Sequence, residues 1–388
     1  MTPRSHSSQR SKHYALLGGL LLLALGVRLW RLTYHSLWFD ETMSVFWANQ
    51  PAARIWEVGM HLVEDRHPPL YYLMLRGWTI LFGSSDAVVR SLGAMLGALA
   101  VLPAFGIGRL LGDRRAGALA ALLVALNPFL VWYSQEARMF VPAATLGLFA
   151  LYGLLRGWQS CSVRFESLPS NWDADDRRGA CLARVWGVIW WGIVLVGLVM
   201  CVYSYLFGVF LLVVAGLWLV ALLLLTLRVQ ERGRHWSAFL VGAIVLTLAG
   251  GLMLPLLWAG WQVSGTEFTE GRMFDGMGGV LLRQLTAYTL HQGPWSDGVV
   301  RAAQVGAGLL ALAGLALPLR SRPGSGELRS AGRPLLALYL VGPLLLGGLL
   351  LARNRVLFDK PHYFTFLAPA LCLLWGRGLA ALLDRARL

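Results

Sequence analysis

The chain is a series of long apolar segments separated by short polar ones. A helix of roughly 17 to 25 apolar residues crosses the hydrocarbon core of a bilayer, and segments of that length recur along the 388 residues. The pattern therefore predicts an all-α, polytopic integral membrane protein with about ten transmembrane helices. We place these at 14–33, 87–108, 116–133, 139–155, 185–204, 207–227, 237–257, 299–319, 335–352 and 363–382.

One apolar segment is too short for this scheme. Leu70 to Phe82 extends about 20 Å as a helix, and it carries Arg76 near its centre. Counting it as a span would move the arginine-rich loops that follow to the outer face. We therefore interpret it as an interfacial or re-entrant helix. If it crosses the membrane, the protein has eleven spans.

Composition and charge support a membrane path. The chain is 57% hydrophobic and 14% charged, and its net charge is +14. Basic residues concentrate in the short segments that this path places in the cytoplasm, as the positive-inside rule requires. Both termini are then cytoplasmic in a multi-pass protein of the cell membrane. The first apolar segment lacks a small-residue cleavage site, so we expect a retained helix rather than a signal peptide.

The basic charge does not indicate nucleic-acid binding, because no basic, aromatic-interleaved soluble module is present. No polar block is large enough for a second domain, so we expect a single transmembrane domain over 1–388. Two large loops, 34–86 and 258–298, lie on its external face. The first contains an amphipathic stretch whose apolar face we assign to Ile55, Trp56, Met60 and Val63.

The most informative polar feature is the pair Asp40-Glu41, which follows the first apolar helix. Two adjacent carboxylates resist hydrocarbon and do not help a chain insert into a membrane. Chemistry at the lipid–water boundary explains them, with Asp40 and Glu41 as catalytic candidates. The alternative is a structural role, because acidic residues also favour the first turn of a helix.

Further candidates fall on the same face. A carboxylate can accept the proton of an attacking hydroxyl, and cations can neutralise a departing phosphate, so together they suit transfer of a group from a lipid phosphate. The structural alternatives are an interfacial ion pair for Glu136 and Arg138, a cap on the Pro-Pro turn for His67, and headgroup anchors for the remaining cations. The candidates for binding donor phosphate or sugar are His67, Glu136, Arg138, Arg353, Arg355, Lys360, His362 and Tyr363.

Other polar and aromatic residues have simpler explanations. Cys201 and Cys372 lie in apolar segments and are expected to be buried packing residues, and no cysteine pair has metal-site spacing. We therefore assign no metal ligand, although a divalent metal remains open. We assign Tyr71, Tyr72, Trp132 and Tyr133 to an interfacial aromatic belt, with contact to a donor lipid or sugar as the alternative.

Three short segments resemble motifs of one enzyme group. Leu37-Trp38-Phe39-Asp40-Glu41, His67-Pro68-Pro69-Leu70-Tyr71-Tyr72 and Ser134-Gln135-Glu136-Ala137-Arg138-Met139 resemble the GT-C superfamily of membrane glycosyltransferases in order and spacing. The branch they resemble most comprises the protein-mannosyltransferase-like and aminoarabinose-transferase-like enzymes of glycosyltransferase families 39 and 83. Each motif alone is weak, whereas three in order on one face are a strong signal.

The resemblance implies transfer of a sugar from a polyprenyl-phosphate carrier, on the periplasmic or extracellular face, with inversion at the anomeric carbon. It assigns the general base to Asp40, a supporting role to Glu41, the second-loop acid and cation to Glu136 and Arg138, and a pocket near donor phosphate or metal to His67. Relatives carry Arg-Tyr where this chain has His362-Tyr363. Lys360 or Arg355 would then supply the charge.

Two other function classes stay open at this stage. A transporter or lipid flippase would place ionisable residues near the middle of the bilayer and show inverted repeats. A scaffold subunit would tolerate alanine at Asp40, Glu136 and Arg138. For an enzyme, the sequence leaves open the sugar and the hydroxyl acceptor, which is a glycan, a lipid or a protein.

Overall fold

The computed structural model describes residues 4–161, 174–226, 232–263, 276–291, 293–319, 327–353 and 360–386. Within these ranges the chain is helical and contains no strand, which confirms the all-α prediction. The helices are α1 (Arg4–Leu29), α2 (Phe39–Ala48), α3 (Ala52–His61), α4 (Leu70–Phe82), α5 (Asp86–Leu99), α6 (Val101–Leu111), α7 (Arg114–Leu126), α8 (Pro128–Ser134), α9 (Phe140–Cys161), α10 (Ala174–Ser204), η1 (Leu206–Gly208), α11 (Val209–Thr226), α12 (Arg232–Val263), α13 (Met277–Thr289), α14 (Asp297–Ala316), α15 (Glu327–Ser330), α16 (Gly332–Arg353), η2 (Pro361–Phe364) and α17 (Leu367–Arg385).

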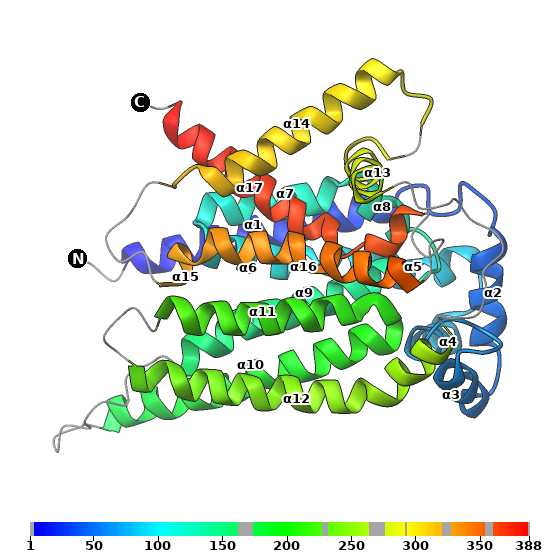
Figure 1. The fold of residues 1–388 in the computed structure, drawn as a ribbon, viewed down its shortest axis with the longest axis horizontal. Coiled ribbons are helices and arrows are strands. Elements are labelled where there is room, and N and C mark those ends of the chain that lie inside the picture. The colour runs from blue at the N-terminus through cyan, green and yellow to red at the C-terminus, as the bar shows by residue number, and fades with distance from the viewer. Residues whose placement is uncertain are drawn as a thin grey trace.

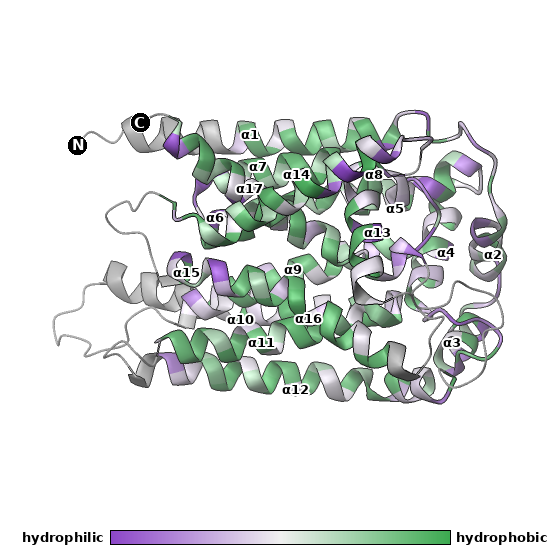
Figure 2. Ribbon diagram, turned by 45° about the horizontal axis from the view of Figure 1, so that its top comes forward, coloured by the Kyte–Doolittle hydropathy of each residue, from purple (hydrophilic) through white to green (hydrophobic). Residues whose placement is uncertain are grey.

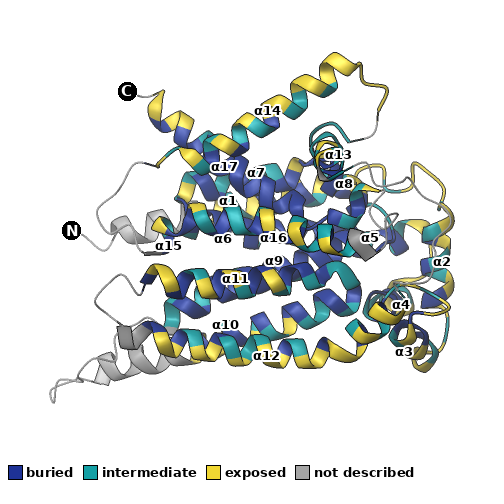
Figure 3. Cartoon of the chain, in the orientation of Figure 1, coloured by how far each residue is buried: buried dark blue, intermediate teal, exposed yellow. Residues whose placement is uncertain are grey.

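The long helices run side by side along the long axis of the molecule (Figure 1). Both chain ends lie at one end of this bundle, and α2, α3 and α4 lie at the other, which we call the loop end. Hydrophobic residues follow the long helices, whereas hydrophilic ones gather near the ends (Figure 2). The outer faces of α12 and α14 expose apolar side chains (Figure 3), as expected for helices that face lipid.

The predicted membrane helices are present. Among the described residues, eight helices are long and apolar enough to cross a membrane, and α7 with α8 would make a ninth if this pair, bent by 52°, counts as one span. The apolar part of α1, Tyr14–Leu29, is shorter. The ten predicted segments fall on these eight helices, on the α7–α8 pair and on α1, so the polytopic prediction holds, whereas the number of ten spans stays a prediction.

The bend between α7 and α8 explains a buried arginine. Pro128 has no N–H to continue the helix, and the Asn127 side chain caps α8 by accepting from the Leu130 N–H at 3.0 Å. The carbonyls at the end of α7 therefore need other donors. Arg28, which is fully buried in α1, donates to the carbonyls of Val124 (3.0 Å) and Ala125 (2.8 Å).

Arg377 has the same function at the opposite end of the bundle. This buried side chain of α17 donates to the carbonyl of Leu111 at the end of α6 (3.0 Å) and to that of Gly314 near the end of α14 (2.9 Å). Arg28 and Arg377 are thus bonded to helix carbonyls, and neither lines the cavity described below.

The short apolar segment forms α4, with the predicted boundaries. It contacts α2, α3, α5 and α10, and its helical periodicity turns Tyr71, Tyr72 and Leu75 inward. The assignment of Tyr71 and Tyr72 to an interfacial belt is therefore wrong, since their exposures are 0% and 2%. Whether α4 crosses a membrane stays a prediction.

The apolar face predicted for the first loop also needs correction. In α3, Ile55 and Val58 are buried together with the following Leu62, whereas Trp56 and Val63 are exposed. The helix ends at His61, and Leu62 adopts a left-handed conformation with φ of 58°. This turn breaks the helical period and directs Val63 away from the bundle.

In the second loop, α12 extends to Val263, and α13 packs against α8, α14 and η2. The acidic residues at 267, 270 and 275 lie outside the described residues. Cys201 and Cys372 are fully buried, as predicted.

Candidate active site

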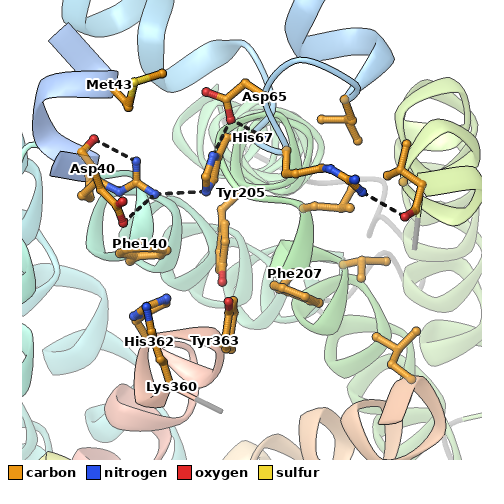
Figure 4. Close-up of a pocket in the computed structure, with 18 of the residues that line it drawn as sticks. Asp40, Met43, Asp65, His67, Phe140, Tyr205, Phe207, Lys360, His362 and Tyr363 are labelled. Carbon is orange, nitrogen blue, oxygen red and sulfur yellow. Dashed lines mark hydrogen bonds and ion pairs between the residues drawn. The ribbon is translucent and has the colours of Figure 1, made fainter. Parts of the chain in front are cut away.

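A cavity of about 600 Å³ lies at the loop end, where α2, the segment 62–67, Arg138, η1, α12 and η2 meet (Figure 4). One part of its wall is polar and the other apolar. The polar part contains Asp40, Glu64, Asp65, Arg66, His67, Arg138, Lys360, His362 and Tyr363. The apolar part contains Leu206, Phe207, Val209, Leu257, Trp261, Val263 and Leu350.

Most of the candidates from sequence therefore meet at one cavity. Asp40, His67, Arg138, Lys360, His362 and Tyr363 line it, although they come from four separate segments of the chain. Glu41 and Glu136 lie beside the cavity without lining it. Arg355 and the side chain of Arg353, at the end of α16, lie outside the described residues.

Asp40 and Glu41 share the first turn of α2, but they have different surroundings. The Asp40 side chain is 33% exposed and faces the cavity. Glu41 is fully buried, and its carboxylate accepts from Nε and Nη2 of Arg90 at 2.8 and 2.6 Å. It also accepts from the backbone N–H groups of Trp38 (3.2 Å) and Ala137 (2.9 Å). Glu41 thus positions Asp40 without reaching the cavity.

Arg90 connects Glu41 to the segment between α1 and α2, and the sequence analysis did not identify it. Besides binding Glu41, its guanidinium donates to three carbonyls in the segment between α1 and α2: Leu32 (2.9 Å), His35 (2.7 Å) and Ser36 (3.1 Å). One buried cation therefore joins α5 to the start of α2 and, through Glu41, to the residue before Arg138. The available signal was a charged residue inside a predicted span.

Arg138 lies where the acid and the histidine meet. It precedes α9 and is nearly buried, with 4% of its side chain exposed. Its Nη2 is 3.7 Å from Oδ2 of Asp40 and 3.1 Å from Nε2 of His67. Its Nη1 donates to the Asp40 carbonyl at 3.2 Å and to Ser44 Oγ at 3.4 Å. This fixed charge beside the cavity suits a phosphate.

His67 is held from behind by Asp65, which the sequence analysis also missed. Oδ1 of Asp65 lies 2.6 Å from His67 Nδ1 and accepts from the His67 backbone N–H at 3.0 Å, while Oδ2 accepts from the Tyr72 hydroxyl at 2.8 Å. Behind this segment, Gly59 of α3 contacts Pro69, since a Cβ at Gly59 would lie 2.6 Å from the Pro69 nitrogen. The Pro-Pro turn thus fixes where His67 points.

The pKa values of this pair follow from burial and charge. Burial would raise the pKa of Asp65, but the hydrogen bonds that its carboxylate accepts from His67 and Tyr72 outweigh burial and lower the pKa. Burial, followed by the charge of Arg138, lowers the pKa of His67, although Asp65 acts in the opposite direction.

The segment before α17 supplies the opposite wall. The His362 ring stacks on Phe140, with ring centres 4.4 Å apart. Burial, helped by the charges of Arg138 and Lys360, lowers the pKa of His362 to about 3, so the imidazole is neutral at physiological pH. Lys360 is exposed and lines the same wall. Among the described residues of this segment, Lys360 is the cation that lines the cavity, whereas Arg355, the other candidate for this charge, lies outside the described residues.

Glu136 lies in a separate environment outside the cavity. One carboxylate oxygen accepts from the Trp132 indole N–H at 2.8 Å, and the other is buried without a hydrogen-bond partner. Burial raises the pKa of Glu136 to about 7, Glu41 adds to the effect, and the Trp132 bond opposes it. The folded protein therefore holds a proton here over a pH range in which an unfolded chain releases it.

This shift predicts a pH-dependent stability. Glu136 favours folding most below its unfolded pKa, near 4.5, and that contribution is lost as the pH rises through about 7. We expect the apparent unfolding temperature of the wild type in detergent to fall between pH 5 and 8 by more than that of Glu136→Gln. Parallel pH profiles for the two proteins would contradict the assignment.

Among the described residues, no three His, Cys, Asp or Glu side chains form a group that could hold a metal ion.

Comparisons with known proteins identify similar folds. Residues 66–165 match the family model described as dolichyl-phosphate-mannose-protein mannosyltransferase. No curated protein sequence matches the chain. Among solved structures, the chain resembles the archaeal oligosaccharyltransferase AglB from Archaeoglobus fulgidus in complex with an inhibitory peptide and a dolichol-phosphate. The TM-score is 0.54 at 13% identity, covering 97% of this chain and 51% of that one.

The fold also resembles ArnT from Cupriavidus metallidurans. The apo structure gives a TM-score of 0.53 at 14% identity over 96% of this chain and 60% of that one. The structure bound to undecaprenyl phosphate gives 0.50 at 15% identity over 98% and 62%. The chain thus spans about half to three fifths of the length of these proteins. Together the comparisons confirm the resemblance to the GT-C superfamily and show that the chain has its fold.

Proposed function

We propose that this chain, with its GT-C fold, is a glycosyltransferase that moves a sugar from a polyprenyl-phosphate-linked donor to a hydroxyl acceptor. The observation that carries the proposal is the two-part cavity. A carboxylate and cations lie at one part, and an apolar wall formed by η1, α11, α12 and α16 continues from it. A lipid phosphate linked to a sugar likewise combines a charged, polar head with an apolar chain.

The donor would lie with its phosphate between Arg138, His67 and Lys360. Arg138 offers paired N–H groups, and a charge held in a cavity with little water interacts strongly with a developing negative charge. The isoprenoid chain would follow Leu257, Trp261 and Leu350 toward the lipid. The bound dolichol-phosphate of AglB and undecaprenyl phosphate of ArnT support this class of ligand.

Asp40 would act as general base. It accepts the proton of the acceptor hydroxyl while that oxygen bonds to the anomeric carbon of the sugar. The bond between the anomeric carbon and the phosphate oxygen breaks, and its electron pair remains on the departing phosphate. Attack opposite the leaving group inverts the anomeric centre, as the resemblance implies. Glu41 and Arg90 hold Asp40 in place.

We place this chemistry on the periplasmic or extracellular face of the cell membrane. The chain would be a single transmembrane domain over 1–388, with 34–86 and 258–298 as its external loops and both termini in the cytoplasm. The basic residues of the short polar segments support this orientation.

The test is transfer by purified protein in proteoliposomes that contain a panel of polyprenyl-phosphate sugars and candidate glycan, lipid and peptide acceptors. Production of a glycosylated acceptor together with free polyprenyl phosphate supports the proposal. Movement of the lipid-linked sugar across the bilayer in the absence of any acceptor would instead support a flippase.

Arg138→Gln is expected to lower kcat/KM for the donor by about 10²–10³, because it removes a preorganised charge from the departing phosphate. The matched control is Arg301→Gln, which alters an exposed arginine near the start of α14 that does not line the cavity. Equal kcat/KM values for Arg138→Gln and the control would contradict the role of Arg138.

A further inference from the structure

The contact between Arg138 and His67 fixes the protonation state of the histidine. Arginine has only donors, so Nε2 of His67, 3.1 Å from Arg138 Nη2, must carry a lone pair. The proton then sits on Nδ1, which donates to Asp65 at 2.6 Å. His67 is therefore a neutral imidazole in this structure, in agreement with its lowered pKa.

Asp65 is positioned to stabilise a protonated His67 ring. Its two oxygens accept from Nδ1 and the backbone N–H of His67 and from the Tyr72 hydroxyl, and its pKa lies below the usual value. A carboxylate behind Nδ1 stabilises an imidazolium whenever Nε2 gains a proton. His67 is thus kept neutral by the surroundings of Nε2, the ring nitrogen that faces the cavity and Arg138.

Arg138 keeps spare hydrogen-bonding capacity for a buried cation. Its distances to Asp40 Oδ2, the Asp40 carbonyl and Ser44 are 3.7, 3.2 and 3.4 Å, and its buried Nε has no hydrogen-bond partner. A phosphate oxygen offers a shorter, charge-assisted bond than a neutral imidazole does. A phosphate in the cavity would therefore draw Nη2 away from His67 and leave Nε2 facing an anion.

We propose that His67 takes up one proton when a phosphate group enters the cavity, and so changes from an acceptor for Arg138 into a second cationic donor to the phosphate. This inference rests on the proposed function of the same cavity. The titratable and charged groups that face His67 or line the cavity around it are Asp40, Glu64, Asp65, Arg66, Tyr72, Arg138, Tyr205, Lys360, His362 and Tyr363. Asp65 and Asp40 favour the imidazolium, whereas the cations oppose it until a phosphate offsets them.

The change in phosphate charge during the reaction explains how proton uptake by His67 would assist it. The lipid-linked donor is a phosphodiester with one negative charge, and the departing lipid is a monoester with a charge near −1.5 to −2 at pH 7. The proton of the acceptor hydroxyl goes to Asp40, and the proton on His67 comes from water. The uptake therefore matches the monoester product more closely than the donor.

The test is calorimetric titration of polyprenyl monophosphate into the purified protein, in buffers with different ionisation enthalpies. We compare the wild type with His67→Gln, which keeps an acceptor but cannot be protonated, and with His67→Lys, which is already charged. The wild type should take up close to one proton more than either variant. Its affinity should also fall more steeply with pH, by up to about tenfold per pH unit.

The outcomes separate the two proposals. Equal proton uptake and equal pH slopes in the wild type and His67→Gln would overturn the role of His67 and leave the proposed function standing. Absence of polyprenyl monophosphate binding in the wild type would overturn both. His67→Lys controls for misfolding caused by substitution at residue 67, because this variant is expected to bind the lipid without taking up the additional proton.

Discussion

Replacing Asp40 with Asn is expected to lower turnover by about 10²–10⁴ while the protein still inserts and purifies normally. Asparagine has nearly the same size but cannot accept the proton of the attacking hydroxyl. The rest of the site should survive, because Arg138 bonds to the backbone carbonyl of residue 40 and to Ser44 as well as facing the carboxylate. Donor binding should therefore change far less than turnover.

The measurement is single-turnover transfer in proteoliposomes at saturating donor. Glu57→Gln is the matched control, because it removes an exposed carboxylate from the neighbouring α3. The control should retain wild-type turnover. If Asp40→Asn retained it as well, Asp40 would not be the base.

Arg90→Ala is expected to have the largest effect on stability. It leaves the Glu41 carboxylate buried and without its cation, and breaking a buried ion pair in this way costs about 3–5 kcal/mol. It also removes the donor to three backbone carbonyls before α2. The apparent unfolding temperature in detergent should therefore drop sharply, and turnover should fall because Asp40 and Arg138 lose a common support.

A double variant, Arg90→Met with Glu41→Leu, separates the two effects. With both charges removed, much of the stability should return, because no isolated charge remains buried. Turnover should stay low, since nothing then ties α2 to the backbone of Ala137. Arg109→Ala, at an exposed arginine of α6, is the control for loss of a cation. A stable, fully active Arg90→Ala protein would contradict the positioning role.

Much of this site could be predicted because charge and hydropathy constrain which loops share a face. Placing Asp40, His67, Arg138 and Lys360 on one side of the membrane required only the alternation of spans, and all four line one cavity. The boundaries of α4 followed from the apolar segment between Pro69 and Gly83.

The errors and omissions have a common physical origin. Arg90 and Asp65 act through partners in three dimensions, and nothing in their immediate sequence marks those partners. Tyr71 and Tyr72 look like interfacial aromatics in a short helix, yet packing against neighbouring helices buries them. Glu136 shares a motif with Arg138, but a tight turn directs its carboxylate to Trp132 instead of the cavity.

The central claim is that a carboxylate and cations in this cavity transfer a sugar from a polyprenyl-phosphate lipid. The most direct test is mass spectrometry of glycolipids and glycoproteins in a deletion strain complemented with the wild type or with Asp40→Asn at equal protein levels. The account predicts that a glycosylated product disappears on deletion, returns with the wild type and stays absent with Asp40→Asn. Return of that product with Asp40→Asn, or an unchanged set of glycoconjugates on deletion, would contradict it.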